Sequence, residues 1–351
     1  MNRGILSTIG HTPLVEFTRI FKGSDIHFFA KLEQFNPGGS TKDRPAHNII
    51  THGLKSGIIG PETVIVESSS GNMGIGLAQI CAYHKLRFIC VVDSKTTRQN
   101  INLLRAYNAE VEIVTKPDPE TGEYLHARIQ RVKDLLGVFE DSFWPNQYAN
   151  ELNSSAHYRT MDEITVALNG ALDFLFCATS TCGTLRGCAE YKRRHGLHTK
   201  IIAVDAVGSV IFGDKKCKRL IPGHGAALRP PLYAAHLADE CVHVTDLDCV
   251  IGCHRLLQEE AFLAGGSSGA IISAIERLRP CLQPGSICVA VLADRGERYL
   301  DTIFSDQWVT ENFGDVSHLW KGDQRAMSTS ASGQESSATL EISQPYSQSL
   351  P

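Results

Sequence analysis

The 351-residue chain lacks several features that would each define a class of protein. It has no apolar run near the roughly 20 residues that span a bilayer, so we expect no membrane protein. It has no basic excess, with 34 Lys and Arg against 38 Asp and Glu, so we expect no nucleic-acid binder. Its first ten residues lack a basic cluster followed by an apolar stretch, so we expect no signal peptide and a cytoplasmic protein.

Metal-ligand spacing is also missing. The 11 cysteines include no Cys-X-X-Cys pair, and the 14 histidines show no ligand pattern, so we predict no metal site. The cysteines stand in apolar surroundings and are expected to be reduced core residues. Hydrophobic residues make up 42% of the chain and charged residues 21%, which is typical of a soluble globular protein.

Short apolar segments with strand character alternate with segments of helical character over most of the chain. Continuous apolar strands separated by helices indicate parallel sheets covered on both faces. We therefore predict an α/β protein with two sheets and a ligand crevice at the strand ends. The predicted strands are 63–67, 88–92, 110–114, 173–178, 200–207 and 286–292, and the predicted helices are 73–84, 98–107, 124–136, 185–195 and 270–278.

The end of the chain differs in composition. From about residue 322 it is rich in Ser, Gln and Thr and poor in apolar residues. Such a segment buries too little apolar surface to order itself, so we predict a disordered tail. A docking peptide is the alternative.

Two loops in the first half of the chain carry candidate chemistry. Residues 36–44 read NPGGSTKDR and place Lys42 at the expected start of a helix. A positive charge there opposes the helix dipole, so Lys42 is either a solvated lysine or a functional amine that is neutral or bound as an imine. Residues 68–72 read SSSGN, a hydroxyl-rich helix start that suits a carboxylate, although an ordinary N-cap turn is the simpler interpretation of this loop by itself.

Two further loops lie in the second half. Residues 180–184 read STCGT between an expected strand and helix, and their small residues let backbone N–H groups approach a phosphate. They match neither a Walker loop nor a Gly-X-Gly-X-X-Gly motif, so ATP and NAD are weakly supported. Residues 265–269 read GGSSG and are either a second anion site or a flexible connection.

In this order and wording, the four loops resemble those of the fold-type II pyridoxal-phosphate enzymes of the cysteine synthase and cystathionine β-synthase family. The opening IGHTPL at 9–14 also matches that family, and the resemblance covers about residues 4–305. It implies two open, twisted, mostly parallel sheets with helices on both faces. It further implies a homodimer. The domains implied are a large cofactor-binding domain of residues 1–35 and 151–315, a smaller movable substrate domain of residues 36–150, and a tail of residues 316–351.

The resemblance implies pyridoxal 5′-phosphate as cofactor and amino acids as substrates. Lys42 would bind the cofactor covalently and carry the Cα proton, Asn72 would contact its 3′-oxygen, and Ser267 would contact its pyridine nitrogen. A serine there does not enforce a protonated ring, which favours elimination at Cβ over transamination. The cofactor phosphate would be held by Ser180, Thr181, Cys182, Gly183 and Thr184, and the substrate carboxylate by Ser69, Ser70 and Gly71.

Some residues depart from plain cysteine synthases. Ser180 and Cys182 stand where glycine is usual, and Met73 stands where threonine is usual. With the segments 207–232 and 294–301, they resemble a branch that joins O-phospho-L-serine to L-glutamate, a step toward 2,3-diaminopropionate for siderophores and peptide antibiotics. In that branch Ser180, Tyr148 and Arg128 would meet the reaction intermediate or the second substrate. A sulfhydrylase remains the main alternative, and a catalytically silent regulatory module with Lys42 as a relic is a remote one.

Overall fold

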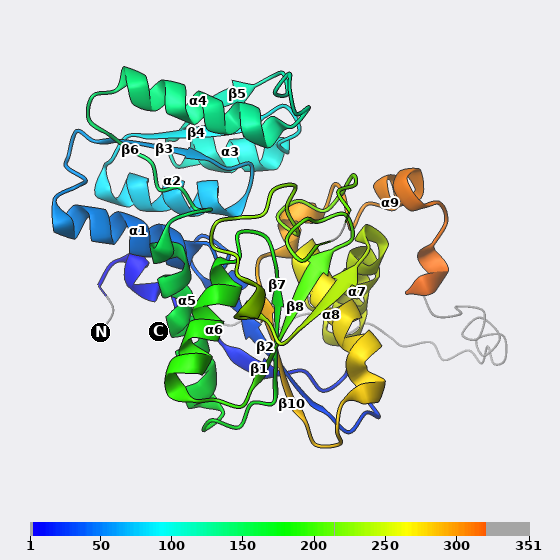
Figure 1. Cartoon of the computed structure of the whole chain (residues 1–351). Coiled ribbons are helices and arrows are strands. Elements are labelled where there is room, and N and C mark those ends of the chain that lie inside the picture. Colours follow the sequence, from blue (N-terminus) through cyan, green and yellow to red (C-terminus); the bar gives the residue numbers. More distant parts are fainter. Residues whose placement is uncertain (1–2, 214, 321–351) are drawn as a thin grey trace, which may run out of the picture.

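The computed structural model describes residues 3–213 and 215–320 (Figure 1). The predicted tail from about residue 322 lies outside these ranges. The first residues of the predicted tail segment 316–351 form a 3-10 helix, η6 (Ser317–Leu319), on the folded body. Next to it, Trp320 is buried and stacks on His254 with ring centroids 4.3 Å apart.

The larger sheet has six strands in the order β1-β2-β10-β7-β8-β9. β1 pairs antiparallel with β2, and the other neighbours pair in parallel. The strands predicted from the sequence at 173–178, 200–207 and 286–292 are confirmed as β7, β8 and β10 of this sheet. The strands are β1 (Leu14–Glu16), β2 (His27–Leu32), β7 (Phe174–Ala178), β8 (Lys200–Ala206), β9 (Glu240–Val244) and β10 (Ile287–Leu292).

The smaller sheet has four parallel strands in the order β5-β4-β3-β6. Its strands are β3 (Val64–Ser68), β4 (Phe88–Asp93), β5 (Glu110–Val114) and β6 (Ser142–Phe143). They all lie inside the segment 36–150, and this sheet forms a separate layer beside the larger one (Figure 1). The predicted α/β class with two mostly parallel sheets is confirmed, while the division into domains stays a proposal.

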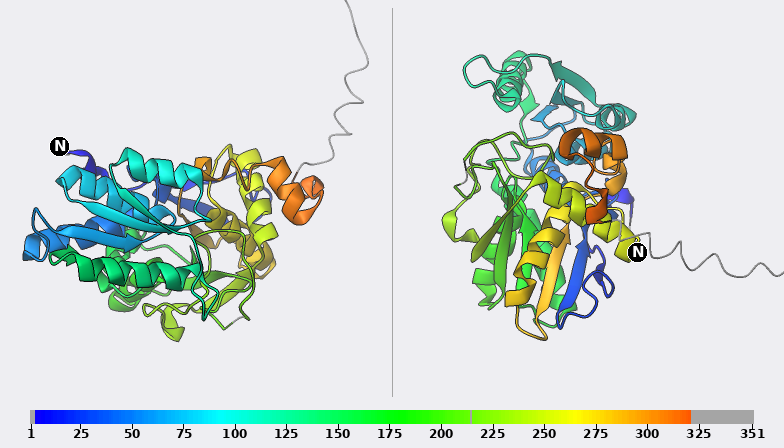
Figure 2. Two further views of the ribbon diagram at one scale, coloured as in Figure 1. Left: turned by 90° about the horizontal axis from the view of Figure 1, so that it is seen from above. Right: turned by 90° about the vertical axis from the view of Figure 1, so that its right-hand side faces the viewer.

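Helices cover both faces of each sheet (Figures 1 and 2). In β4, Phe88 and Cys90 face the core formed with α1 and α2, whereas Ile89 and Val91 face α4. This burial on both faces explains why the strands read as continuous apolar runs. The helices are α1 (Asp43–Ser56), α2 (Asn72–His84), α3 (Arg98–Ala106), α4 (Tyr124–Val138), α5 (Glu151–Ala167), α6 (Gly183–His195), α7 (Asp246–Glu260), α8 (Gly266–Leu278) and α9 (Asp306–Phe313).

The larger sheet is covered in the same way. One face packs against α5 and α6 through residues such as Met161 and Leu185, and the other packs against α7 and α8 through Val250 and Ile271. The remaining short 3-10 helices are η1 (Ile5–Thr8), η2 (Glu33–Phe35), η3 (Ala235–Leu237), η4 (Arg279–Cys281) and η5 (Gly296–Tyr299). No helix in residues 3–213 and 215–320 has both the length and the apolar character needed to cross a bilayer.

All eleven cysteines are free thiols, and eight are buried, as expected of reduced core residues. The expectation is wrong for Cys217 and Cys281, which are exposed. Cys217 lies in the long loop between β8 and β9, and Cys281 ends η4, so neither belongs to a strand or helix face that packs into a core.

Candidate active site

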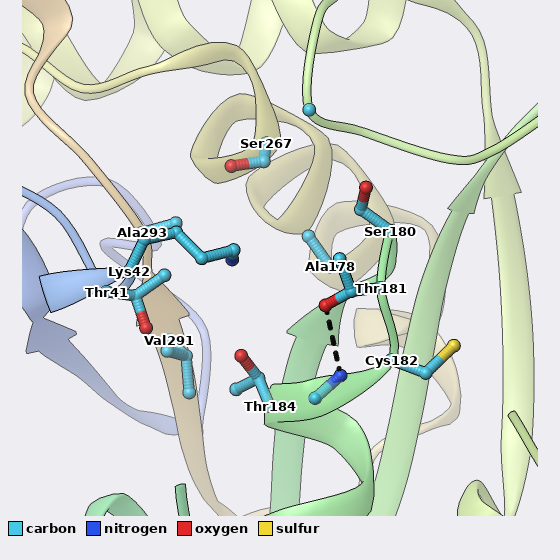
Figure 3. Close-up of a pocket in the computed structure, with 12 residues that line it drawn as sticks. Thr41, Lys42, Ala178, Ser180, Thr181, Cys182, Thr184, Ser267, Val291 and Ala293 are labelled. Atoms are coloured by element: carbon cyan, nitrogen blue, oxygen red, sulfur yellow. Dashed lines mark hydrogen bonds between the residues drawn. The ribbon is translucent and has the colours of Figure 1, made fainter. Parts of the chain in front are cut away.

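A cavity lies where the carboxyl ends of β7 and β10 meet the starts of α1, α6 and α8 (Figure 3). Lys42, Ser267 and the whole loop 180–184 line it, although they are far apart in the sequence. This is the place where open parallel sheets bind ligands. The other lining residues are Thr41, Ala178, Gly223, Val291 and Ala293, none of which was predicted.

Lys42 is the N-cap residue of α1, as the sequence predicted for a lysine at a helix start. Its amine extends into the cavity (Figure 3) and forms no hydrogen bond or ion pair with the described residues. Burial lowers the pKa of this amine, and the negative charges of Asp294 and Glu33 oppose the shift. The backbone is fixed nearby, since Thr41 N donates to the carbonyl of Ala293 at 2.8 Å.

A buried ion network holds the first turn of α1. Arg44 Nε lies 2.7 Å from Glu33 Oε2, and Arg44 Nη2 lies 2.7 Å from Glu163 Oε2. Lys31 Nζ reaches the same oxygen of Glu163 at 2.7 Å. The network ties α1 to β2, η2 and α5, so it fixes the backbone that carries Lys42 two residues before Arg44.

The loop 180–184 forms a cup at the N-terminus of α6. Free N–H groups and the helix dipole at such a terminus favour an anion. Gly183 must be glycine, because an added Cβ would lie 2.2 Å from Asn153 Oδ1. Cys182 has a left-handed backbone with φ of 63°, and its side chain packs against Ile211 and Leu232. Figure 3 shows its sulfur directed away from the cavity, so Cys182 presents only its backbone.

Two threonine hydroxyls complete the cup, and each has a partner on α5. Thr181 Oγ1 accepts from Asn153 Nδ2 at 3.2 Å, and Thr184 Oγ1 hydrogen-bonds with His157 Nε2 at 3.3 Å. Burial lowers the pKa of His157 to about 3, so its imidazole is neutral at physiological pH. Sequence reasoning missed both partners, because nothing near Asn153 or His157 in the chain marks them as neighbours of the cup.

Ser267 lies in the first turn of α8, on the side of the cavity opposite the cup threonines (Figure 3). Its neighbour Ser268 accepts a hydrogen bond from Ala293 N at 3.2 Å. This contact fixes the start of α8 against the end of β10. Ser267 therefore stands on a rigid support with its hydroxyl at the cavity.

The SSSGN loop lies beside the cavity, and Asn72 is not among its lining residues. Asn72 Nδ2 donates to Asp294 Oδ2 at 2.8 Å, and Asn72 Oδ1 accepts from Arg298. Ser69 Oγ accepts from Gly74 N at 2.9 Å, so this hydroxyl satisfies one N–H group in the first turn of α2, whose N-cap residue is Gly71. Ser70 offers its carbonyl to Asn100 Nδ2 at 3.0 Å. Ser69 is therefore engaged with the first turn of α2, and the carboxylate role of the loop stays a prediction.

Arg128 and Tyr148 also lie outside the lining of the cavity. Arg128 is buried, with its Nε 3.3 Å from Asp93 Oδ2 and without a hydrogen-bond partner among the described residues. Burial raises the pKa of Tyr148, and the charges of Arg128 and Arg219 oppose this shift. Arg219 was not predicted, although it lies in the segment 207–232 where we expected added recognition.

A buried carboxyl stands behind the SSSGN loop. Glu67 ends the apolar part of β3 and accepts hydrogen bonds from Trp144 Nε1 at 3.1 Å and from Gln147 N at 3.1 Å. Burial nevertheless raises the pKa of Glu67 to about 7. These bonds hold the segment that carries Tyr148 against the end of β3. Among the described residues, no three His, Cys, Asp or Glu side chains gather as metal ligands would.

A buried amine, a hydroxyl-lined anion cup and a serine opposite the cup line one cavity, and this arrangement suits a phosphorylated cofactor. The residues fit pyridoxal phosphate, because hydroxyls and a helix N-terminus line the cup and Lys42 Nζ has no partner among the described residues. The model of the pyridoxal-phosphate dependent enzyme family matches residues 5–294, and the chain belongs to this family. Pyridoxal phosphate is therefore its cofactor.

Solved structures of similar fold come from the cysteine synthase group. An O-acetylserine-dependent cystathionine β-synthase from Helicobacter pylori has a TM-score of 0.80 and 30% identity, over 86% of this chain and 98% of that chain. An O-acetylserine sulfhydrylase isoform 3 from Entamoeba histolytica has a TM-score of 0.80 and 30% identity, over 86% of this chain and 91% of that chain. An O-ureido-L-serine synthase has a TM-score of 0.80 and 28% identity, over 88% of this chain and 98% of that chain. The protein is thus a β-replacement enzyme of the cysteine synthase family.

Proposed function

We propose that the enzyme joins O-phospho-L-serine and L-glutamate to give N-(2-amino-2-carboxyethyl)-L-glutamate and phosphate. This product is a precursor of 2,3-diaminopropionate for siderophores or peptide natural products. The observation that carries the choice of substrates is the pair of arginines whose charges act on Tyr148, because both substrates bring extra negative charge that a thiol acceptor does not.

The cofactor would be held by Lys42, the loop 180–184, Ser267 and Asn72. Once bound, it supplies an electron sink for the negative charge that develops at Cα. Backbone N–H groups at the start of α6 and the hydroxyls of Thr181 and Thr184 would hold its phosphate. The hydroxyl of Ser267 would meet the pyridine nitrogen without forcing its protonation, which favours loss of a group from Cβ.

Lys42 is the proton carrier in this proposal. Its amine stands in the cavity on a backbone fixed by the Arg44 network, and burial favours its neutral, basic form. It would take the Cα proton of O-phospho-L-serine as phosphate leaves from Cβ. The α-amine of glutamate would then form the new bond at Cβ and release one N–H proton to solvent, and Lys42 would return the proton it took to Cα.

The substrate carboxylate would bind at the start of α2. Because the Ser69 hydroxyl is already engaged with the first turn of α2, backbone N–H groups of the loop and the hydroxyl of Ser70 are the donors that remain there. Gly71 would let the carboxylate approach the backbone, since an added Cβ there meets nothing within 4 Å and the side of the loop is open. The helix dipole of α2 adds to the attraction.

The acidic parts of the substrates would meet Arg128 and Arg219. Both guanidinium groups keep a buried Nε without a hydrogen-bond partner among the described residues, and that of Arg128 is ion-paired with Asp93 at 3.3 Å. Arg128 belongs to α4 beside the small sheet, whereas Arg219 donates to the carbonyl of His224 at 2.8 Å. The Arg219 segment is held near the cup, because Gly225 N donates to the carbonyl of Thr179 at 2.7 Å. Two cations whose charges both act on Tyr148 suit the carboxylates of glutamate or the leaving phosphate.

Three further features belong to the proposal. The hydroxyl of Ser180 lines the cavity where glycine is usual in plain cysteine synthases, and it would contact the reacting substrate. A homodimer in the cytoplasm, which the family resemblance implies, completes the account. Size-exclusion chromatography with light scattering tests the oligomeric state.

A cysteine synthase is the second candidate. It is favoured by the similar structures that are named as acting with O-acetylserine or as a sulfhydrylase. In this case the two arginines would have a structural role only. The arginines therefore separate the two candidates.

The test is a pair of variants, Arg219→Met and Arg128→Met, with the exposed Arg193→Met as control. We expect KM for glutamate to rise at least about tenfold in both, because each loses one charge-assisted contact. Arg193→Met should match the parent. An unchanged KM for glutamate in the well-folded Arg219→Met and Arg128→Met proteins would contradict the proposed contacts.

A further inference from the structure

The loop after β10 connects three of the four sequence motifs. Ala293 accepts from Thr41 N at 2.8 Å and donates to Ser268 Oγ at 3.2 Å. One residue later, the carbonyl of Asp294 accepts from Gly265 N at 3.2 Å. This loop therefore has backbone contacts both to the lysine segment and to the segment that carries Ser267.

The side chain of Asp294 adds the third motif. Its Oδ2 accepts from Asn72 Nδ2 at 2.8 Å and from Tyr299 Oη at 2.7 Å. Its Oδ1 is buried and has no hydrogen-bond partner among the described residues. The carboxyl group is 1% exposed. Gly265 makes room for it, because an added Cβ there would lie 2.0 Å from Oδ1.

The backbone of Asp294 also lies beside the lysine segment, because Asp294 forms a β-bridge with Ser40, two residues before Lys42. Two carboxylates, those of Asp294 and Glu33, act on the amine, and the neutral His157 lies on its α5 side. Glu33 is already neutralised by Arg44, with Nε and Nη2 at 2.7 and 2.8 Å, and it accepts from Thr12 as well. Asp294 forms no ion pair within the described residues, and Arg298 of the same segment donates to Asn72 Oδ1 instead, so the carboxylate of Asp294 remains available to Lys42.

We propose that Asp294 is a positioning residue, which orients the amide of Asn72 and serves as the counter-charge of Lys42. A lysine that takes up a proton in a buried cavity needs a negative charge nearby, and Asp294 supplies it. The same carboxylate fixes which atoms of Asn72 face the cofactor. The inference rests on the proposed role of Lys42 and does not depend on which second substrate is used.

The test measures the titration of Lys42 in cofactor-free protein. Trace labelling with acetic anhydride at a series of pH values, read by mass spectrometry of the Lys42 peptide, gives the midpoint. Asp294→Asn keeps an oxygen for Asn72 and Tyr299 but removes the charge. We expect the midpoint to fall by about one pH unit or more, because the ammonium form loses its counter-charge.

Asp301→Asn is the control, since Asp301 is an exposed acid of the same segment, and its midpoint should equal that of the parent. An unchanged midpoint in folded Asp294→Asn protein would overturn the proposal. Tyr299→Phe is the second variant, for the case that Asp294→Asn does not fold. It keeps the charge and removes one hydrogen bond to it, so the midpoint should stay or rise, and a fall would also overturn the proposal.

A second readout uses the loaded enzyme. In Asp294→Asn we expect an altered absorption spectrum of the bound cofactor, because Asn72 is reoriented, and a kcat at least about tenfold lower with KM for O-phospho-L-serine within twofold. A parental spectrum and kcat would contradict the proposal. Failure of the proposed function would instead appear as full activity of Lys42→Ala, which leaves the titration result for Asp294 unaffected.

Discussion

The hydroxyl of Thr184 lies 3.3 Å from Nε2 of His157, so a neutral imidazole stands directly behind the phosphate-binding loop. The other ring nitrogen, Nδ1, lies 3.2 Å from Thr160 Oγ1. Hydroxyl groups therefore contact both ring nitrogens, and burial keeps the imidazole ring uncharged. The cup is therefore sensitive to anything that protonates this ring.

His157 predicts a pH dependence of stability. Its pKa is about 3 in the folded protein and near 6.5 in the unfolded chain, so the unfolded state binds the extra proton between these values. The stability contribution is complete above pH 6.5 and declines as the pH falls toward 3. Denaturant midpoints at pH 7 and pH 5 should therefore differ less in His157→Gln than in the parent. The variant His52→Gln, at an exposed histidine, serves as control. An equal difference between the midpoints at pH 7 and pH 5 in all three proteins would refute the assignment.

Lys42→Ala should abolish turnover and leave the fold intact. The side chain of Lys42 makes no capping hydrogen bond to α1, so its loss removes no contact that holds the helix. The protein should still bind the cofactor without a covalent bond, through the cup at 180–184. Steady-state assays and thermal midpoints check both points, and retained activity would show that another residue is the essential amine.

Ser267→Asp should slow β-replacement. A carboxylate at the start of α8 would protonate the pyridine nitrogen of the cofactor and stabilise negative charge at Cα too well for rapid elimination. Transamination should appear as a side reaction. The measurement is kcat together with the absorption spectrum, and Ser267→Ala is the matched control without charge. Parental kinetics and spectrum in Ser267→Asp would mean that Ser267 does not face the ring.

Gly183→Ala should weaken cofactor binding at least about tenfold, because the new methyl group would displace Asn153 and through it the Thr181 hydroxyl. Gly137→Ala in α4 is the control, since a Cβ there meets nothing within 4 Å and alanine favours a helix. Equilibrium titration with pyridoxal phosphate compares the two. Equal affinities would contradict the role of Gly183.

The sequence predicted the fold best where burial is apolar on both faces of a strand. β3, β4 and β10 read as unbroken apolar runs and appear within a residue or two of their predicted bounds. β2 was missed because Lys31 lies within it, and its burial is made favourable by contacts with the distant Glu163 and with the carbonyl of Thr12. α5 was missed because the buried side chains toward the cup are polar, as with His157, so no apolar stripe marks it.

The sequence predicted those residues of the candidate site that lie in short local motifs. Lys42, the loop 180–184 and Ser267 each lie in a short pattern, and all of them line the cavity. Asp294 was noticed only as part of a segment that resembles a narrower branch, because its contact with Asn72 joins residues 222 positions apart. Contacts of this kind come from the meeting of the two sheets, and no local pattern contains them.

The most direct test of the central claim is a competition of substrates in one buffer. The holoenzyme is mixed with O-phospho-L-serine and equal concentrations of glutamate and sulfide, with O-acetylserine in a parallel reaction, and the products are weighed by mass spectrometry. The proposed function predicts N-(2-amino-2-carboxyethyl)-L-glutamate as the main product, with kcat/KM higher for O-phospho-L-serine than for O-acetylserine. Efficient formation of cysteine from O-acetylserine, with no adduct of glutamate, would contradict it and identify a sulfhydrylase.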